Sequence, residues 1–230
     1  MIFLPGTDKQ IQHLTSKIEL KGKKILLIGG GCEEIVKIIS QQNPDSIYVI
    51  VDDESNLIEY RLKLKGNNKI KITFMDFALT DFPDVNFDLV YAQGSVSRDD
   101  RNSIANEVFR ILKKDGVYSV GEIVKLKKVA PAFMKDIWNS GDLSPIFIDE
   151  LENFYKQNKF DIVDSVNLNS TLKDFYSSAD KKIKIAVDDE MFSLDDKKLL
   201  KKFKHEVNAF NKLGGNKFMG FVSLILRKSV

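Results

Sequence analysis

The sequence has little cysteine and no long apolar run, and each absence excludes a class of protein. Cys32 is the single cysteine among 230 residues, which excludes an intramolecular disulfide and a cysteine-rich zinc site. No apolar run reaches the length of a membrane span, and the apolar residues 1–5 are too few for a secretory signal. We therefore expect a cytoplasmic protein that has no metal site and does not associate with a membrane.

The sequence also has little excess charge of either sign. It holds 35 basic and 33 acidic residues, for a formal net charge of +2, so the total provides no strong attraction to nucleic acid or to a membrane. A lysine-rich stretch at 197–204 follows acidic residues at 188–196, which favours a solvated helix face. The length and the absence of repeats predict one domain over residues 1–230.

A short apolar strand followed by three glycines is the element around which the rest of the predicted fold is organised. Residues 25–28 are uniformly apolar, which is typical of a parallel strand covered on both faces. The glycines at 29–31 form a turn, and Glu33 and Glu34 begin the helix that follows, where carboxylates suit the positive end of the helix dipole. Because glycine has no Cβ, a bound nucleotide can approach this backbone closely.

Strand and helix patterns then alternate along the chain, which predicts a mainly parallel sheet with helices on both faces. We expect an N-terminal helix within residues 1–20, a Rossmann-like core at 21–166, a helical lid insertion at 168–217 and a last strand at 218–228. Residues 124–144 are predicted to be irregular, and a helix is expected to begin at Pro145. The fold class is thus α/β: a doubly wound, seven-stranded sheet whose last strand enters antiparallel at the end of the sheet. The other strands are expected at 47–51, 70–75, 87–92, 117–123 and 160–166, and the helices at 8–20, 33–42, 54–65, 99–113, 145–159, 172–179 and 195–213.

Several polar side chains fall at the carboxyl ends of these strands, where open α/β sheets bind ligands. Asp52 lies about twenty residues after the glycine turn, where a carboxylate can accept hydrogen bonds from both ribose hydroxyls. Asp76 can accept a hydrogen bond from the amine of adenine, with Phe77 beside the ring. Each feature alone has a purely structural interpretation, and Asp53 can simply cap the next helix. Together they predict a nucleoside site, made of Gly29, Gly30, Gly31, Asp52, Asp53, Asp76, Phe77 and Gln93.

The chain resembles the class I S-adenosylmethionine-dependent methyltransferases from about residue 20 to 166 and in its last strand. Residues 28–33 resemble the family's first glycine motif, residues 107–116 its helix and turn before the fifth strand, and residues 220–226 its terminal strand. The resemblance implies methyl transfer with S-adenosyl-L-methionine as the cofactor. It also implies that Asp52 binds the ribose and that Asp76 and Phe77 lie at the adenine.

Two residues depart from the family's first motif, and they keep other functions open. Leu27 replaces an acid and Glu33 replaces the third glycine, both near the methionine end of the cofactor. An aminopropyl- or aminocarboxypropyl-transferring enzyme on the same fold is one alternative, although residues 91–95 lack the acid that aminopropyltransferases carry there. A non-catalytic cofactor-binding protein is another. A nicotinamide enzyme is disfavoured because its motif requires glycine at Glu34.

The acceptor side of the site is expected beneath the long connections at 124–144 and 168–217. Both leave the carboxyl edge of the sheet, where long connections are usually functional. Trp138, Tyr176 and His205 are the candidates for lining an acceptor pocket, and each also has an ordinary structural interpretation. Methyl transfer needs alignment and exclusion of water more than a fixed set of side chains, so no catalytic residue is assigned. The sequence favours a small-molecule acceptor over nucleic acid and leaves the oligomeric state open.

Overall fold

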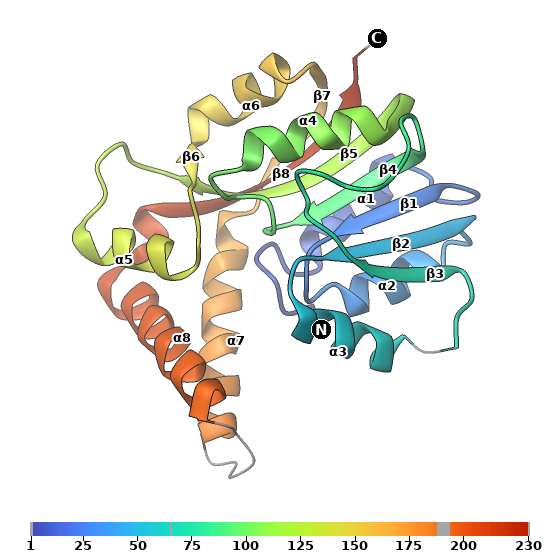
Figure 1. Ribbon diagram of the computed structural model, residues 1–230. Helices are drawn as coiled ribbons and strands as arrows, with labels where there is room; N and C mark the ends of the chain where they lie inside the picture. The colour runs from blue at the N-terminus through green and yellow to red at the C-terminus, as the bar shows by residue number, and fades with distance from the viewer. Residues whose placement is uncertain (1, 65, 188–193, 230) are drawn as a thin grey trace.

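The computed structural model is built on an eight-stranded sheet in the order β3-β2-β1-β4-β5-β8-β7, with the short β6 paired to β5 (Figure 1). It describes residues 2–64, 66–187 and 194–229, with the backbone alone at 182, 184–187, 194–200 and 202. The strands are β1 (Lys24–Ile28), β2 (Ser46–Val51), β3 (Ile70–Phe74), β4 (Phe87–Gln93), β5 (Leu112–Lys125), β6 (Ile146–Phe147), β7 (Phe160–Asn167) and β8 (Met219–Lys228).

The strand predicted at 25–28 lies in the middle of the parallel half of this sheet. Ile25 is in register with Ile47 of β2 on one side and with Leu89 of β4 on the other. The side chains of residues 25–28 are almost completely buried, as expected for a parallel strand covered on both faces. The carboxyl ends of β1, β2 and β4 consequently meet at one edge, next to the glycine turn.

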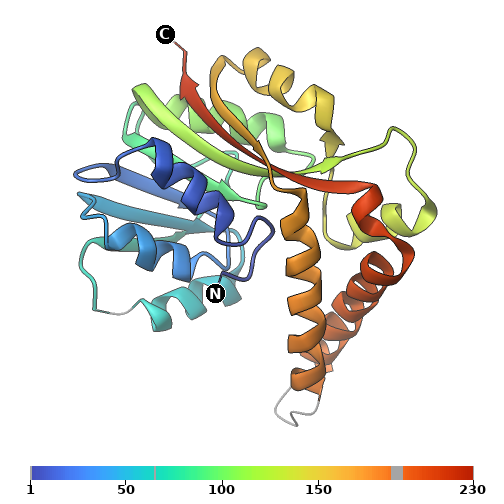
Figure 2. The same cartoon turned by 180° about the vertical axis from the view of Figure 1, so that it is seen from behind.

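Helices cover both faces of the sheet, which confirms the doubly wound α/β class. Buried side chains of α1, α2 and α3 share one core with the inner strands, and those of α4 and α6 share another on the opposite face (Figures 1 and 2). These helices are α1 (Lys9–Lys17), α2 (Glu33–Ser40), α3 (Glu54–Lys63), α4 (Arg101–Ile111) and α6 (Ile148–Gln157).

The last strand is antiparallel to both of its neighbours, as predicted, but its expected position at the end of the sheet is wrong. β8 lies between β5 and β7. Its first eight residues are all buried, whereas β7 alternates between exposed and half-buried residues after Phe160. A strand that is apolar on both faces is stabilised most when it lies between two other strands. A strand whose residues alternate in exposure can lie at the edge of the sheet. The alternation in β7 was the signal in the sequence that could have placed it.

The prediction of irregular structure at 124–144 is also wrong, because this segment contains α5 (Ala132–Ser140). Pro131 precedes the helix, where its fixed φ and missing N–H cost nothing. Met134, Ile137 and Trp138 form the buried side of the helix. After Pro145, β6 pairs with the end of β5 before α6 begins at Ile148, so the predicted helix start at Pro145 is three residues early.

The predicted lid insertion forms two long helices beyond the carboxyl edge of the sheet, α7 (Asn169–Val187) and α8 (Leu194–Leu213), followed by η1 (Gly215–Lys217) (Figure 2). α7 packs against α8, and α8 packs against α5. On α8, Lys201 and Lys204 are exposed, whereas residues 188–190 of the predicted charged stretch lie outside the described residues. Within the described chain, every helix is too short or too polar to cross a membrane.

Candidate functional site

The glycine turn after β1 is closely surrounded by other parts of the chain. Gly29 and Gly31 have φ angles of +115° and +74°, a conformation that side chains other than glycine rarely adopt. A Cβ on any of the three glycines would also meet a neighbour. It would lie 2.5 Å from Ser95 at Gly29, 2.6 Å from Asn56 at Gly30 and 3.1 Å from Leu4 at Gly31. The turn therefore requires glycine at positions 29 and 31 for backbone shape, whereas a side chain at position 30 would displace the flexible end of Asn56.

Tyr60 of α3 holds this turn in its conformation through two hydrogen bonds. Its hydroxyl donates a hydrogen bond to the carbonyl of Gly29 at 3.1 Å and accepts one from the N–H of Cys32 at 2.5 Å. Burial raises the pKa of the Tyr60 hydroxyl above its usual range, so the group remains a donor. The sequence analysis missed this residue, although a tyrosine within the polar sequence of α3 was an available signal.

Cys32 lies directly after the turn and is an inert, buried thiol. Burial is the main cause that raises its pKa to about 12, and the thiolate is the reactive form. We therefore expect a chromogenic disulfide reagent to leave the native protein unmodified at pH 8 and to titrate its single thiol after denaturation in urea. Rapid modification of the native protein would contradict this expectation.

Asp52 and Phe77, predicted to contact ribose and adenine, lie on either side of one arginine side chain. The Asp52 carboxylate forms an ion pair with Arg98, which comes from the loop between β4 and α4. The guanidinium carbon of Arg98 lies 5.6 Å from the centre of the Phe77 ring. A single arginine side chain thus contacts both the Asp52 carboxylate and the ring of the buried Phe77 at the carboxyl edge of the sheet. The sequence analysis did not single out Arg98.

The other predicted carboxylates already accept local hydrogen bonds. Asp53 caps α3 by accepting a hydrogen bond from the N–H of Asn56 at 3.0 Å, and this bond is the main cause that lowers the Asp53 pKa. Asp76 accepts a hydrogen bond from the N–H of Ala78 at 2.8 Å through one carboxylate oxygen. Its role at adenine, like that of Asp53 at the ligand, stays a prediction.

Gln93 holds the N-terminal segment over the end of β4. Its side-chain amide donates hydrogen bonds of 2.8 Å to the carbonyls of Pro5 and Thr7. Gly6, between them, donates to the hydroxyl of Thr171 at the start of α7. Residues 4–7 therefore form a strap from the glycine turn to the lid helices, and the role of Gln93 at the cofactor stays a prediction.

The two departures from the family motif have different environments. Leu27 is completely buried among the apolar side chains shared by β1 and α2. Glu33 is the first residue of α2, and its carboxylate lies 3.2 Å from the Lys63 ammonium of α3. The methionine end of the predicted site thus has an apolar side chain in place of the acid, and the Glu33 carboxylate is neutralised by Lys63.

A buried polar cluster anchors the loop that carries Arg98. Glu122 of β5 is completely buried and accepts hydrogen bonds from Arg101 at 3.0 Å, from the Tyr155 hydroxyl at 2.6 Å and from the Ser97 hydroxyl. Arg101 also donates to the carbonyl of Ser144, after α5. The cluster joins β5 and α6 to the β4–α4 loop and to the connection after α5. Sequence reasoning missed it because its members are distant in the chain.

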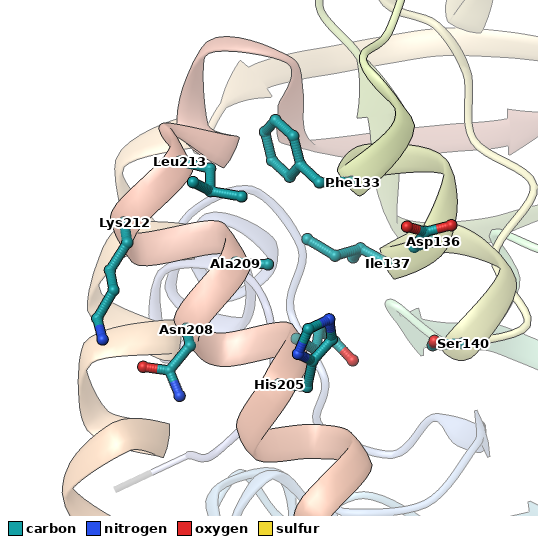
Figure 3. Close-up of a pocket in the computed structure, with 10 residues that line it drawn as sticks. Phe133, Asp136, Ile137, Ser140, His205, Asn208, Ala209, Lys212 and Leu213 are labelled. Carbon is teal, nitrogen blue, oxygen red and sulfur yellow. The ribbon is translucent and has the colours of Figure 1, made fainter.

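A cavity of about 380 Å³ lies between α5 and α8 (Figure 3). His205 lines it and is exposed. Tyr176 is not among the lining residues. Its hydroxyl donates a hydrogen bond to Glu206 at 2.7 Å, and its ring stacks on Phe210. Trp138 is buried in the apolar cluster between the lid helices and β8. The cavity is lined by Phe133, Asp136, Ile137, Ser140, His205, Glu206, Asn208, Ala209, Lys212 and Leu213.

Residues 26–120 match the family model described as a methyltransferase domain. Over these residues the chain is similar to methyltransferase domains, which confirms the resemblance found in the sequence. The matched residues contain the glycine turn, Asp52, Phe77 and Arg98, so the similarity includes the segment that forms the candidate site. Among the described residues, no three His, Cys, Asp or Glu side chains form a group that could hold a metal ion.

Three individual proteins are similar to this chain. The phosphoethanolamine N-methyltransferase of Plasmodium falciparum is 26% identical over 163 residues, which cover 69% of this chain and 55% of that protein. Phosphoethanolamine N-methyltransferase 2 of Haemonchus contortus, solved in complex with S-adenosyl-L-methionine, has a TM-score of 0.77 at 15% identity, covering 99% of this chain and 54% of the other. The cyclase SpnF has a TM-score of 0.80 at 19% identity, covering 97% and 81%. The chain thus spans about half the length of both phosphoethanolamine methyltransferases.

Proposed function

We propose that this chain is an S-adenosyl-L-methionine-dependent methyltransferase that acts on a small-molecule acceptor in the cytoplasm. The observation that carries the proposal is that Asp52 and Phe77 contact the same side chain, Arg98, at the edge where β1 and β2 end side by side next to the glycine turn. In this arrangement Asp52 supplies a carboxylate for ribose hydroxyls and Phe77 an aromatic ring for adenine. The similar phosphoethanolamine methyltransferases, one of them solved with the cofactor, support this proposal.

In this proposal the residues of the chain bind and orient the cofactor and the acceptor, and they exclude water. The cofactor, when bound, supplies a methyl group activated by a sulfonium. Asp52 holds the nucleoside, and the strap of residues 4–7 and the lid helices keep water away from the methionine end. The cavity between α5 and α8 receives the acceptor, and the His205 imidazole can take a proton from an acceptor atom that carries one.

Titration calorimetry with S-adenosyl-L-methionine and S-adenosyl-L-homocysteine tests the proposal. We expect both to bind the purified wild-type protein with dissociation constants in or below the micromolar range, because class I enzymes must bind the cofactor before the acceptor can react. The absence of heat with either ligand at millimolar concentration would contradict the assignment of the site.

A second candidate function is supported by Leu27 alone. Its apolar, buried side chain replaces the acid that commonly helps to hold the amino group at the methionine end. An aminopropyl-transferring enzyme uses the decarboxylated cofactor, whose tail has no carboxylate to place. Calorimetry with decarboxylated S-adenosylmethionine in parallel distinguishes the two. Tighter binding of the decarboxylated form would favour aminopropyl transfer, and tighter binding of the ordinary form would favour methyl transfer.

A further inference from the structure

Arg98 lies where the proposed nucleoside should bind. Its guanidinium forms an ion pair with Asp52 and lies over the ring of Phe77, the two groups assigned to ribose and adenine. Both side chains of the ion pair are partly exposed, 30% for Arg98 and 38% for Asp52. An ion pair in this environment is weak enough to be exchanged for a ligand, because exposed ion pairs contribute little to stability.

Arg98 also has a second position available. Its other terminal nitrogen lies 3.1 Å from one carboxylate oxygen of Asp100. The remaining oxygen of Asp100 is buried and, within the described chain, makes no hydrogen bond. A guanidinium that leaves Asp52 can therefore bind both oxygens of Asp100, and a bidentate pair of this kind is stronger than a single contact. Asp142, beyond the end of α5, adds further negative potential on that side.

The backbone around Arg98 is held in place while its side chain remains free to turn. Ser97 and Arg101, on either side of it, both bind the completely buried Glu122. The loop is thus anchored on two sides, so an exchange between Asp52 and Asp100 needs rotation of one side chain and no movement of the loop.

We propose that Arg98 is a built-in competitor for the cofactor: it occupies the nucleoside position in the free protein and moves to Asp100 when the nucleoside binds. This inference rests on the proposed function, because it takes the ligand to be a nucleoside held by Asp52. Cofactor affinity then depends on how strongly the Arg98 guanidinium prefers the Asp52 carboxylate over the Asp100 carboxylate. In the free protein Asp52 is paired with Arg98.

Adenosine is the best probe because it is uncharged and lacks the methionine end of the cofactor. We expect Arg98→Gln to tighten adenosine binding about fivefold, the equivalent of an exposed ion pair of about 1 kcal/mol. Asp100→Asn should weaken it about twofold to threefold, because Arg98 then has only Asp52. Raising the salt concentration should tighten binding to the wild type, since salt screens the competing ion pair, and should have little effect on Arg98→Gln.

Arg110→Gln is the matched control, because Arg110 also forms ion pairs with two carboxylates, Glu107 and Asp84. Arg110 lies at the opposite end of α4, so adenosine affinity should not change. Circular dichroism checks that each variant is folded. The same titrations with S-adenosyl-L-homocysteine should show the same order of affinities.

The outcomes separate this inference from the proposed function. If the wild type binds and Arg98→Gln binds equally or more weakly, Arg98 does not compete and the inference is wrong, while the function stands. If only Arg98→Gln binds, the inference is supported in its strongest form. If neither protein binds adenosine or S-adenosyl-L-homocysteine, the nucleoside site itself is refuted, and the inference is refuted with it.

Discussion

Asp52→Ala should weaken binding of S-adenosyl-L-homocysteine by roughly tenfold to a hundredfold. The proposed contacts are hydrogen bonds from two ribose hydroxyls to one carboxylate, and a hydrogen bond to a charged group contributes about 1.5–3 kcal/mol. The loss is expected to be smaller than the sum of two such bonds, because the variant also releases Arg98 from its ion pair with Asp52. Calorimetry measures the affinity directly.

Asp45→Ala is the matched control for this variant. Asp45 is an exposed aspartate directly before β2, at the opposite end of the strand from Asp52. This substitution removes the same charge and the same number of atoms without changing the proposed site. The affinity of the variant for S-adenosyl-L-homocysteine should therefore match that of the wild type. Equal affinities in Asp52→Ala and the wild type would refute the ribose assignment, whatever the identity of the acceptor.

Glu122→Gln should reduce the free energy of unfolding by about 3 kcal/mol or more. The substitution preserves size but leaves the buried Arg101 guanidinium without its counter-charge, and removing one partner of a buried ion pair typically costs 3–5 kcal/mol. The side-chain exposures of the two residues, 6% for Arg101 and 0% for Glu122, explain why water cannot replace the lost partner. Urea unfolding followed by circular dichroism measures the change.

An exposed pair in the neighbouring helix is the control for this second prediction. Glu152 and Lys156 of α6 are 3.8 Å apart and roughly half exposed, so Glu152→Gln should change stability by less than about 0.5 kcal/mol. The double variant Glu122→Leu with Arg101→Met should be less destabilised than Glu122→Leu alone, because it leaves no unpaired charge. If Glu122→Gln is as stable as Glu152→Gln, the buried cluster is not what holds the loop.

These two residues were not equally visible in the sequence. Asp52 was found because a short apolar strand, a glycine turn and the spacing to the next strand end are all local patterns. Glu122 lies in an ordinary strand pattern, and no residue near it in the sequence indicates that it binds Arg101 or Tyr155. The prediction for α5 failed for a different reason: its apolar spacing was present, but a lysine-rich stretch at 125–128 and Pro131 precede it and Gly141 follows it, a pattern that resembles a loop.

The amino-acid sequence by itself determined the parallel α/β sheet, the glycine turn and the order of carboxylates at the strand ends, because each follows from patterns among residues close in the chain. Only the tertiary structure decided that β8 lies inside the sheet, that Arg98 pairs with Asp52 and that Glu122 gathers Ser97, Arg101 and Tyr155. The physical reason is that such pairings join residues 21 or more positions apart. Their energy depends on burial and geometry that the packed strands and helices create.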